Sequence, residues 1–310
     1  MSPVVVVCGP TATGKSELAC TLAQRASGCV LSADSMQVYR GMDIGTAKVP
    51  EAERRVPHFG LDLVDVDEPY SAALYQSYAR SVISEQHQAL TPVIMAGGTG
   101  LYIQAALDDL RFPEGDQADN PVREKYMALA QEKGSHAVWD VLNSLDEASA
   151  EQIHPHNLKR VVRALEMLEA GESYAERAHG LALAAPVVPA VFVGLAMDRE
   201  VLYQRVNARV DRMREEGLIE EVSGLMDAGF EDALTSRQAI GYKEIIDALH
   251  GQCSMDEAFS QIKQATRRYA KRQMTWFRRE KRIQWLDVTD ASREDIVEQA
   301  VEALKDKGVS

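Results

Sequence analysis

Eight consecutive residues near the N-terminus have the types and spacing of a phosphate-binding loop. They are Gly9, Pro10, Thr11, Ala12, Thr13, Gly14, Lys15 and Ser16, and they fit the pattern G-x-x-x-x-G-K-[ST]. The glycines let backbone N–H groups turn toward phosphate oxygens, and the N-terminus of a following helix adds positive potential. Lys15 would neutralise phosphate charge, and Ser16 could ligate Mg²⁺. We therefore expect this loop to hold a di- or triphosphate. The role of Thr13 is open, because its hydroxyl could reach a leaving oxygen or could cap the helix.

Two further polar clusters follow short apolar runs. Asp34, which begins the first cluster, could ligate a metal, accept a proton from a nucleophile or cap a following helix. Gln37 offers a paired donor and acceptor that suit the edge of a nucleobase. The second cluster is the glycine turn from Gly97 to Gly100, which could be a ligand loop or a packing turn.

The cations are unevenly distributed in a chain whose net charge is -13. That charge argues against a nucleic-acid partner when taken alone, but binding depends on the local potential. His154 and His156 precede a helix with three cations and could form a metal pair; without an obvious third ligand, a solvated or phosphate-binding face is preferred. Residues 205–212 carry arginines near helical spacing, for which a solvated face is the simpler interpretation. The segment 267–282 interleaves cations with aromatics, as an RNA-binding helix or an amphipathic core helix would.

Four apolar runs set the expected architecture, at 4–8, 29–32, 92–96 and 187–195. Helical patterns separate them, which predicts a parallel sheet with helices on both faces and ligands at the carboxyl ends of the strands. Residues 112–186 show only helical patterns, at 122–133, 137–145 and 157–170. We therefore expect an α/β core of residues 1–111 and 187–310, interrupted by a helical insertion at 112–186. After Leu195 the patterns are mostly helical, at 200–216, 218–228, 241–249 and 254–279.

Other sequence features argue against secretion, membranes and zinc. No apolar run approaches the ~18 residues that a membrane span needs, and the start lacks a basic segment before an apolar one. The four cysteines are scattered, without a C-x-x-C pair, so disulfide and zinc interpretations lack support. We expect a cytoplasmic protein that does not enter a membrane, with a monomer as the default state.

Taken together, the motifs resemble the bacterial tRNA dimethylallyltransferase (isopentenyl-tRNA transferase) family, over about Val4 to Arg279. The segments that carry the resemblance are Gly9 to Ser16, Asp34-Ser35-x-Gln37-Val38-Tyr39, Asp43-Ile44-Gly45-Thr46-Ala47-Lys48, Gly97-Gly98-Thr99-Gly100-Leu101-Tyr102, Ile153-His154-Pro155 with Arg160 and Arg163, Gln238-Ala239-Ile240-Gly241-Tyr242, and Lys271-Arg272-Gln273-x-Thr275-Trp276. The resemblance implies a fold like that of P-loop NTPases and transfer of a dimethylallyl group from its diphosphate to the exocyclic amine of the adenosine on the 3′ side of the anticodon.

The resemblance also assigns roles to residues. Lys15, Ser16-bound Mg²⁺ and Arg209 would neutralise the leaving diphosphate. Thr13 would contact the oxygen that bridges to the allyl carbon, and Asp34 would accept the proton of the adenine amine. The implied tRNA contacts are Asp34, Ser35, Met36, Gln37, Thr99, Arg123, Lys159, Arg160, Val161, Val162, Arg163, Arg237, Gln238, Ala239, Ile240, Gly241 and Tyr242.

Three other functions compete with this interpretation. A small-molecule kinase would use Asp34 to activate a hydroxyl and 112–186 as a lid, but has no need of the basic segments at 159–163 and 267–282. A non-catalytic RNA-binding module would leave Lys15 and Asp34 without a task. A prenyltransferase that accepts ATP or ADP shares the loop, and the insertion and the basic helix favour tRNA over it.

Overall fold

A six-stranded, fully parallel sheet forms the centre of the larger part of the chain. The computed structural model describes residues 2–112, 120–182, 184–227, 229–233 and 235–309. The strand order is β3-β2-β4-β1-β5-β6, which confirms the predicted parallel α/β sheet. The strands are β1 (Val4–Cys8), β2 (Cys29–Ser32), β3 (His58–Phe59), β4 (Val93–Gly97), β5 (Ala190–Ala196) and β6 (Ile283–Asp287).

Strand β1 lies inside the sheet, and all five of its side chains are buried. Val4 and Val6 belong to the hydrophobic cluster on one face, whereas Val5 and Val7 belong to the cluster on the other, because successive strand side chains point to opposite faces. A strand covered on both sides needs a continuous β-branched run, which is the signal that the sequence carries there.

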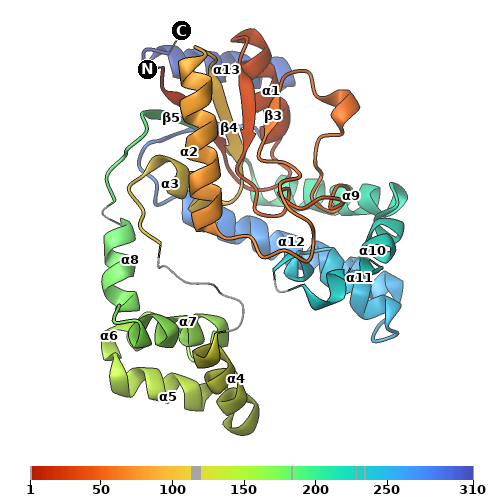
Figure 1. Ribbon diagram of the computed structural model, residues 1–310. Helices are drawn as coiled ribbons and strands as arrows, with labels where there is room; N and C mark the ends of the chain where they lie inside the picture. The colour runs from red at the N-terminus through yellow and green to blue at the C-terminus, as the bar shows by residue number, and fades with distance from the viewer. Residues whose placement is uncertain (1, 113–119, 183, 228, 234, 310) are drawn as a thin grey trace. The chain divides into compact units, whose positions relative to one another are not determined.

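Helices cover both faces of the sheet. One face packs against α1 (Lys15–Arg25) and α13 (Arg293–Lys305). The other packs against α2 (Ala72–Gln88), α3 (Gly100–Leu107) and α12 (Met255–Phe277), and Figure 1 shows α2 lying along it. The remaining helices of this unit are α9 (Arg199–Glu215), α10 (Leu218–Met226) and α11 (Tyr242–Leu249). Their positions agree with the predicted helices to within two residues at most ends.

Strands β3 and β6 were not predicted. Strand β3 has two residues, too few for any periodicity. Strand β6 lies at the sheet edge, and only Ile283 and Leu286 among its five residues are buried. An edge strand half open to water does not need the continuous apolar run that marks central strands, so its sequence, Ile-Gln-Trp-Leu-Asp, lacks that signal. The expectation that the chain is mostly helical after Leu195 is therefore incomplete.

The described chain divides into two compact units, residues 1–108 with 187–310, and residues 109–186. The second unit has its own apolar core, which includes Tyr126, Leu142 and Leu165. It contains only helices among its described residues: α4 (Pro121–Lys133), α5 (Ser135–Leu145), α6 (Glu147–Glu151), α7 (Leu158–Glu169) and α8 (Tyr174–Ala182). Helices α6 and α8 were not predicted. A role for this unit in RNA binding stays a prediction.

Candidate active site

The phosphate loop, Gly9 to Ser16, connects β1 to α1 as predicted. Gly9 has a φ of +136°, and a Cβ there would lie 2.5 Å from the carbonyl oxygen of Leu195 on the neighbouring strand. Gly14 has a φ of +92° and forms the N-cap of α1. Both positions therefore need glycine, because side chains are disfavoured at positive φ. The loop geometry matches that of an anion-binding turn at a helix N-terminus.

Two side chains of the loop fold back onto its own backbone. Lys15 Nζ donates to the carbonyl oxygen of Pro10 at 2.6 Å, and Thr13 Oγ1 donates to the same oxygen at 2.9 Å. Thr13 is buried, and α1 has no side-chain cap. The alternative of Thr13 as a helix cap is therefore wrong, whereas its contact with a leaving oxygen stays a prediction.

The surroundings of Lys15 lower the pKa of its ammonium group. Burial and, secondarily, the charge of Arg209 lower the pKa of Lys15 to about 8, although Asp34 opposes the shift. Burial likewise lowers the pKa of Arg209, again against the effect of Asp34. Two cations enclosed with one carboxylate leave an excess of positive charge, which a bound anion would offset.

Asp34 lies directly after β2, and its Oδ1 accepts a hydrogen bond from the amide of Met36 at 2.9 Å. Turns rather than a helix follow it, so the alternative of a helix cap is wrong and the carboxylate closes a local turn instead. Next to it, Ser35 donates its amide to Thr99 Oγ1 at 3.1 Å. The glycine turn at 97–100 thus contacts the loop that carries Asp34, because β2 and β4 are neighbouring strands.

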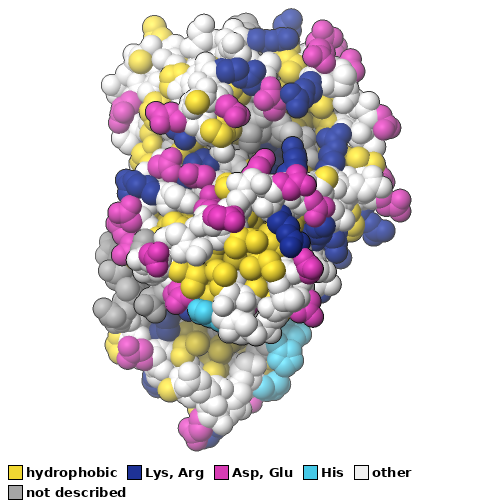
Figure 2. Space-filling model, turned by 90° about the vertical axis from the view of Figure 1, so that its right-hand side faces the viewer, with side chains coloured by type: hydrophobic (Ala, Val, Ile, Leu, Met, Phe, Trp, Pro, Cys, Tyr) yellow, Lys and Arg dark blue, Asp and Glu magenta, His cyan; other side chains and the backbone are white. Residues whose placement is uncertain are grey.

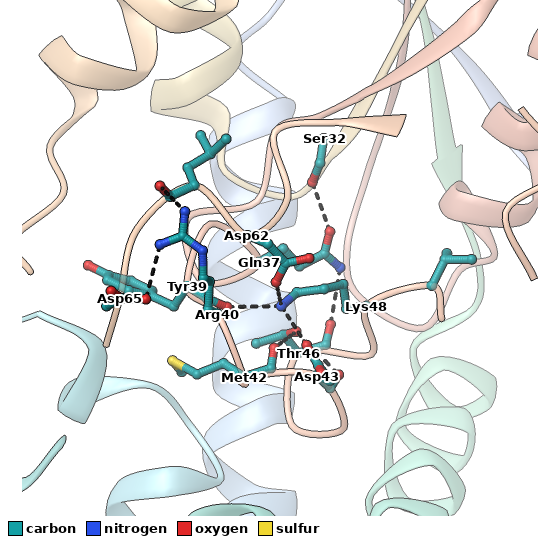
Figure 3. A network of polar contacts seen from close by, with 12 residues as sticks. Ser32, Gln37, Tyr39, Arg40, Met42, Asp43, Thr46, Lys48, Asp62 and Asp65 are labelled. Atoms are coloured by element: carbon teal, nitrogen blue, oxygen red, sulfur yellow. Dashed lines mark hydrogen bonds and ion pairs between the residues drawn. The ribbon is translucent and has the colours of Figure 1, made fainter. Parts of the chain in front are cut away.

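The side-chain amide of Gln37 is held at both ends (Figure 3). Its Oε1 accepts from Ser32 Oγ at 2.8 Å, and its Nε2 donates to the carbonyl oxygen of Thr46 at 3.2 Å. The same carbonyl accepts from Arg209 Nη2 at 3.3 Å. An amide has two donor hydrogens and two acceptor lone pairs, so Gln37 keeps one of each for a base.

A cavity of about 250 Å³ collects ten of the predicted core-unit residues, whereas Gln37 and Thr99 are not part of its lining. Its lining includes Asp34, Arg209 and Thr11 of the phosphate loop. Further lining residues from the predictions are Ser35, Met36, Gln238, Ala239, Ile240, Gly241 and Tyr242. Tyr242 is nonetheless fully buried, whereas Arg237 is exposed and donates to the carbonyl oxygen of Glu231 at 2.6 Å.

A second hollow, of about 490 Å³, borders the phosphate loop at Ala12, Thr13 and Gly14. Thr13, Arg205, Arg209 and Arg212 line it, together with Arg293 of α13. Arg205 and Arg212 are exposed, as the solvated-face interpretation expects, but they also border the phosphate loop. Arg209 lines both hollows.

The remaining predicted tRNA contacts lie in the helical unit. Arg123 Nε and Arg163 Nη1 both pair with the buried carboxylate of Glu166, at 2.7 and 3.0 Å. Val161 and Val162 are buried in the core of this unit, because the helix period points them inward. Their contact with tRNA stays a prediction. Lys159 and Arg160, the other two predicted contacts of this unit, are exposed.

Gln273 on α12 contacts both glycine loops, a role that sequence reasoning missed. Its Oε1 accepts from the amide of Thr11 at 2.8 Å, and its Nε2 donates to the carbonyl oxygen of Gly98 at 3.1 Å. Tyr269, one turn earlier, hydrogen-bonds the side chains of Thr99 and Gln273. The motif Lys271 to Trp276 was quoted for the resemblance, but nothing in it indicated which loops it holds.

The basic segment 267–282 has features of both alternatives, an RNA-binding helix and an amphipathic core helix. Phe277 is buried on the core side, and Arg272 lines the cavity. Arg282 instead forms a bidentate pair with Asp108, at 2.7 and 2.8 Å, and hydrogen-bonds Glu280. Cations and acids are also interspersed on the face drawn in Figure 2. Part of the basic segment is therefore structural.

Replacing Arg282 by methionine should destabilise the core unit by about 3 kcal/mol, because it leaves the carboxylate of Asp108, which is 3% exposed, without its charged partner. Urea unfolding followed by circular dichroism measures the effect. Lys281→Met, which removes the exposed neighbouring cation, serves as the matched control. Equal midpoints for the two variants would contradict the structural role of Arg282.

No metal centre is built from histidine, cysteine or carboxylate clusters in the described parts of the chain. His154 and His156 lie beside each other, with ring centroids 5.3 Å apart, but no third ligand joins them. Ser16, the predicted Mg²⁺ ligand, has an exposed side chain at the start of α1. None of the described helices combines the length and the hydropathy that crossing a bilayer requires.

A parallel sheet with a phosphate loop after its first strand and a cationic cavity at the strand ends defines a P-loop phosphate-binding protein. Comparisons with known proteins specify the family. Residues 37–280 match the sequence model of a family described as IPP transferase, and residues 2–57 match one described as isopentenyl transferase. The chain belongs to the tRNA dimethylallyltransferase family.

Curated and solved relatives agree with this assignment. The chain is 45% identical over 292 residues to a tRNA dimethylallyltransferase from Geobacillus thermodenitrificans, covering 94% of this chain and 92% of the relative. A tRNA isopentenylpyrophosphate transferase structure from Bacillus halodurans is 41% identical, with a TM-score of 0.70 over 99% of this chain and 98% of that one. A eukaryotic dimethylallyltransferase acting on tRNA is 28% identical, with a TM-score of 0.79 over 100% and 81%.

Proposed function

We propose that this chain transfers a dimethylallyl group from dimethylallyl diphosphate to the exocyclic amine of the adenosine on the 3′ side of the anticodon in tRNA. One observation carries the proposal: Asp34, Arg209 and Thr11 of the phosphate loop line the same cavity. A carboxylate that accepts a proton and a guanidinium that neutralises phosphate thus flank one space. The family membership supplies the reaction that joins them.

On the donor side, the carbon–oxygen bond of the allylic diphosphate breaks and diphosphate leaves. Lys15, Arg209 and the amides of the phosphate loop would stabilise the charge that develops on that oxygen. Thr13 would exchange its hydrogen bond with Pro10 for one with the bridging oxygen. The loop amide of Thr11 is already bonded to Gln273, so Gln273 would hold the loop open for the diphosphate.

The proposed Mg²⁺ dependence fits the residues present. Mg²⁺ keeps several waters and binds through few protein oxygens plus substrate phosphates, so a single hydroxyl at the loop is a sufficient protein donor. Ser16 has an exposed hydroxyl there, and it would hold a Mg²⁺ ion that supplies positive charge to the leaving diphosphate. The other ligands would be the diphosphate oxygens and water.

On the acceptor side, the amine nitrogen forms a bond to the allylic carbon and loses a proton to Asp34. An exocyclic amine is weakly basic, so removal of its proton during attack lowers the barrier. Gln37, through the donor and acceptor it keeps, would bind the base edge, with Ser35 and Thr99 beside it. The base must leave the anticodon stack, which costs a few kcal/mol and least in a single-stranded loop.

Binding of the anticodon stem-loop would rest on exposed cations of both units. Lys159 and Arg160 are exposed in the helical unit, and Arg237 is exposed in the core unit. Arg123 and Arg163 would contribute while anchored on Glu166. RNA recognition of this kind depends on shape and on single-stranded bases. We further propose a monomer that works in the cytoplasm, where tRNA is available.

Labelled dimethylallyl diphosphate tests the acceptor directly. The chain is incubated with the label, Mg²⁺ and either tRNA or adenine nucleotides. Label is expected in tRNA, at the adenosine beside the anticodon, and omission of Mg²⁺ should abolish its incorporation. Label that enters only AMP, ADP or ATP would overturn the proposed acceptor, and incorporation unchanged by chelator would overturn the Mg²⁺ dependence.

The pKa of Lys15 predicts a pH dependence for diphosphate binding. Because this pKa is lowered to about 8, the free protein loses the Lys15 charge as the pH rises through 8. Affinity for inorganic pyrophosphate should then weaken by up to tenfold per pH unit above 8. Titration calorimetry between pH 7 and pH 9.5 measures it, and Lys15→Met separates this loss from ionisation of the ligand. The same profile in both proteins would contradict the assignment.

A further inference from the structure

The carboxylate of Glu221, on α10, receives four hydrogen bonds although it does not line the cavity. Its Oε2 accepts from the amides of Asp43 and Ile44, at 3.1 and 2.7 Å. Its Oε1 accepts from the amide of Gly45 at 3.2 Å and from Tyr242 Oη at 2.6 Å. Hydrogen bonds to an ionised group are about twice as strong as neutral ones, so Glu221 binds three successive amides of one loop tightly.

This loop, Asp43 to Thr46, ends at the carbonyl that Arg209 and Gln37 share. Among the described residues, no other acceptor hydrogen-bonds the guanidinium of Arg209. Gln37 has a second anchor in Ser32. A displacement of the Thr46 carbonyl would therefore misplace Arg209 more than Gln37.

The loop has little freedom to settle elsewhere. A Cβ at Gly45 would lie 2.4 Å from the ring of Tyr242, so the backbone and the ring are in close contact. On the other side, Lys48 is buried and its Nζ bonds Asp43 Oδ1 at 2.5 Å and Asp62 Oδ1 at 2.6 Å (Figure 3). Lys48 ties the first residue of the loop, Asp43, to Asp62, and Glu221 fixes the loop amides.

We propose that Glu221 is a positioning residue for prenyl transfer. It holds the Asp43–Thr46 loop so that the Thr46 carbonyl aims Arg209 at the diphosphate. This inference rests on the proposed function for the reaction that Arg209 serves, although the contacts themselves do not depend on it. Glu221 touches neither substrate, and it acts only through the loop.

Glu221→Gln is the direct test, because the amide keeps the side-chain size but turns an N–H group toward hydrogen-bond donors. Single-turnover transfer with saturating tRNA and dimethylallyl diphosphate should slow 10- to 100-fold. Pyrophosphate affinity, measured by calorimetry without tRNA, should weaken three- to tenfold. Glu220→Gln is the matched control, since Glu220 is the preceding residue on α10 and is exposed; both of its values should stay within twofold of the original.

A double-mutant cycle separates positioning from general destabilisation. Glu221→Gln should slow the Arg209→Gln background less than threefold, because the group it positions is already absent. If the double variant showed the product of the two single losses, the inference would be overturned. Unchanged transfer and pyrophosphate affinity in Glu221→Gln would overturn it too. If the unsubstituted protein and Glu220→Gln both fail to transfer label to tRNA, the proposed function fails. The pyrophosphate titration then still tests the link between Glu221 and Arg209.

Tyr242→Phe provides a second variant should Glu221→Gln lose cooperative unfolding. It removes one of the four donors to Glu221 and leaves the ring packed against Gly45. Pyrophosphate affinity should weaken two- to fourfold, and again not in the Arg209→Gln background. An equal effect in both backgrounds would contradict the role assigned to Glu221.

Discussion

Replacing Asp34 by asparagine should reduce prenyl transfer by about 10²- to 10⁴-fold, the usual contribution of a general base. The amide oxygen of asparagine can still accept the hydrogen bond from Met36, so the turn after β2 should persist. The carboxylate that would accept the amine proton is lost. Rates are measured in single turnover with labelled dimethylallyl diphosphate and tRNA.

Binding of tRNA separates this effect from misfolding. Asp34→Asn and Asp34→Ala should both bind tRNA within a few fold of the original protein, because in the proposed function Asp34 would contact one base of a large interface. Asp67→Asn, which changes an exposed carboxylate of the same unit, should transfer at the original rate. Normal transfer by Asp34→Asn would refute its role as the base.

Replacing Lys15 by methionine should lower transfer by about 10³-fold, since removal of one preorganised group that stabilises developing charge costs 10² to 10³ and Lys15 would also contribute to diphosphate binding. Its ammonium now donates to Pro10 of the same loop, and burial, followed by the charge of Arg209, lowers its pKa. The loss should fall on both the single-turnover rate and the affinity for pyrophosphate.

Lys305→Met is the matched control for this variant, because it removes an exposed lysine of α13, away from the loop. Its rate and its pyrophosphate affinity should be unchanged. Binding of tRNA should be the same in both variants. A Lys15→Met protein that binds pyrophosphate as well as the control does would show that the loop does not hold the diphosphate.

The central strands and the long helices could be predicted from the sequence alone. Val4 to Cys8 is apolar at every position because both of its faces are buried. In the amphipathic helices, apolar residues recur at the helical period. Edge strand β6 and the short β3 escaped prediction, since a half-exposed or two-residue strand leaves no distinctive pattern. Within the helical unit, the same periodicity that predicts α7 also buries Val161 and Val162.

The local part of the candidate site was also open to sequence reasoning, because it is built from neighbours in the chain. Positive φ angles at Gly9 and Gly14 are required by the turn itself, and Lys15 follows at a fixed offset. Asp34 and the glycine turn at 97–100 were both expected at the carboxyl ends of the strands, which lie together in a parallel sheet. Their roles in catalysis stay predictions.

The sequence by itself determined that this chain carries a phosphate loop in a parallel α/β sheet and that its motifs are those of a tRNA prenyltransferase family. Only the tertiary structure decided what supports the loops: Gln273 reaches Thr11 across 262 positions, and Glu221 reaches Asp43 across 178. Neither contact follows a helix or strand period. A single glutamate or glutamine has no local signal, because its partners are backbone groups that any residue could supply, and folding alone brings them within hydrogen-bonding distance.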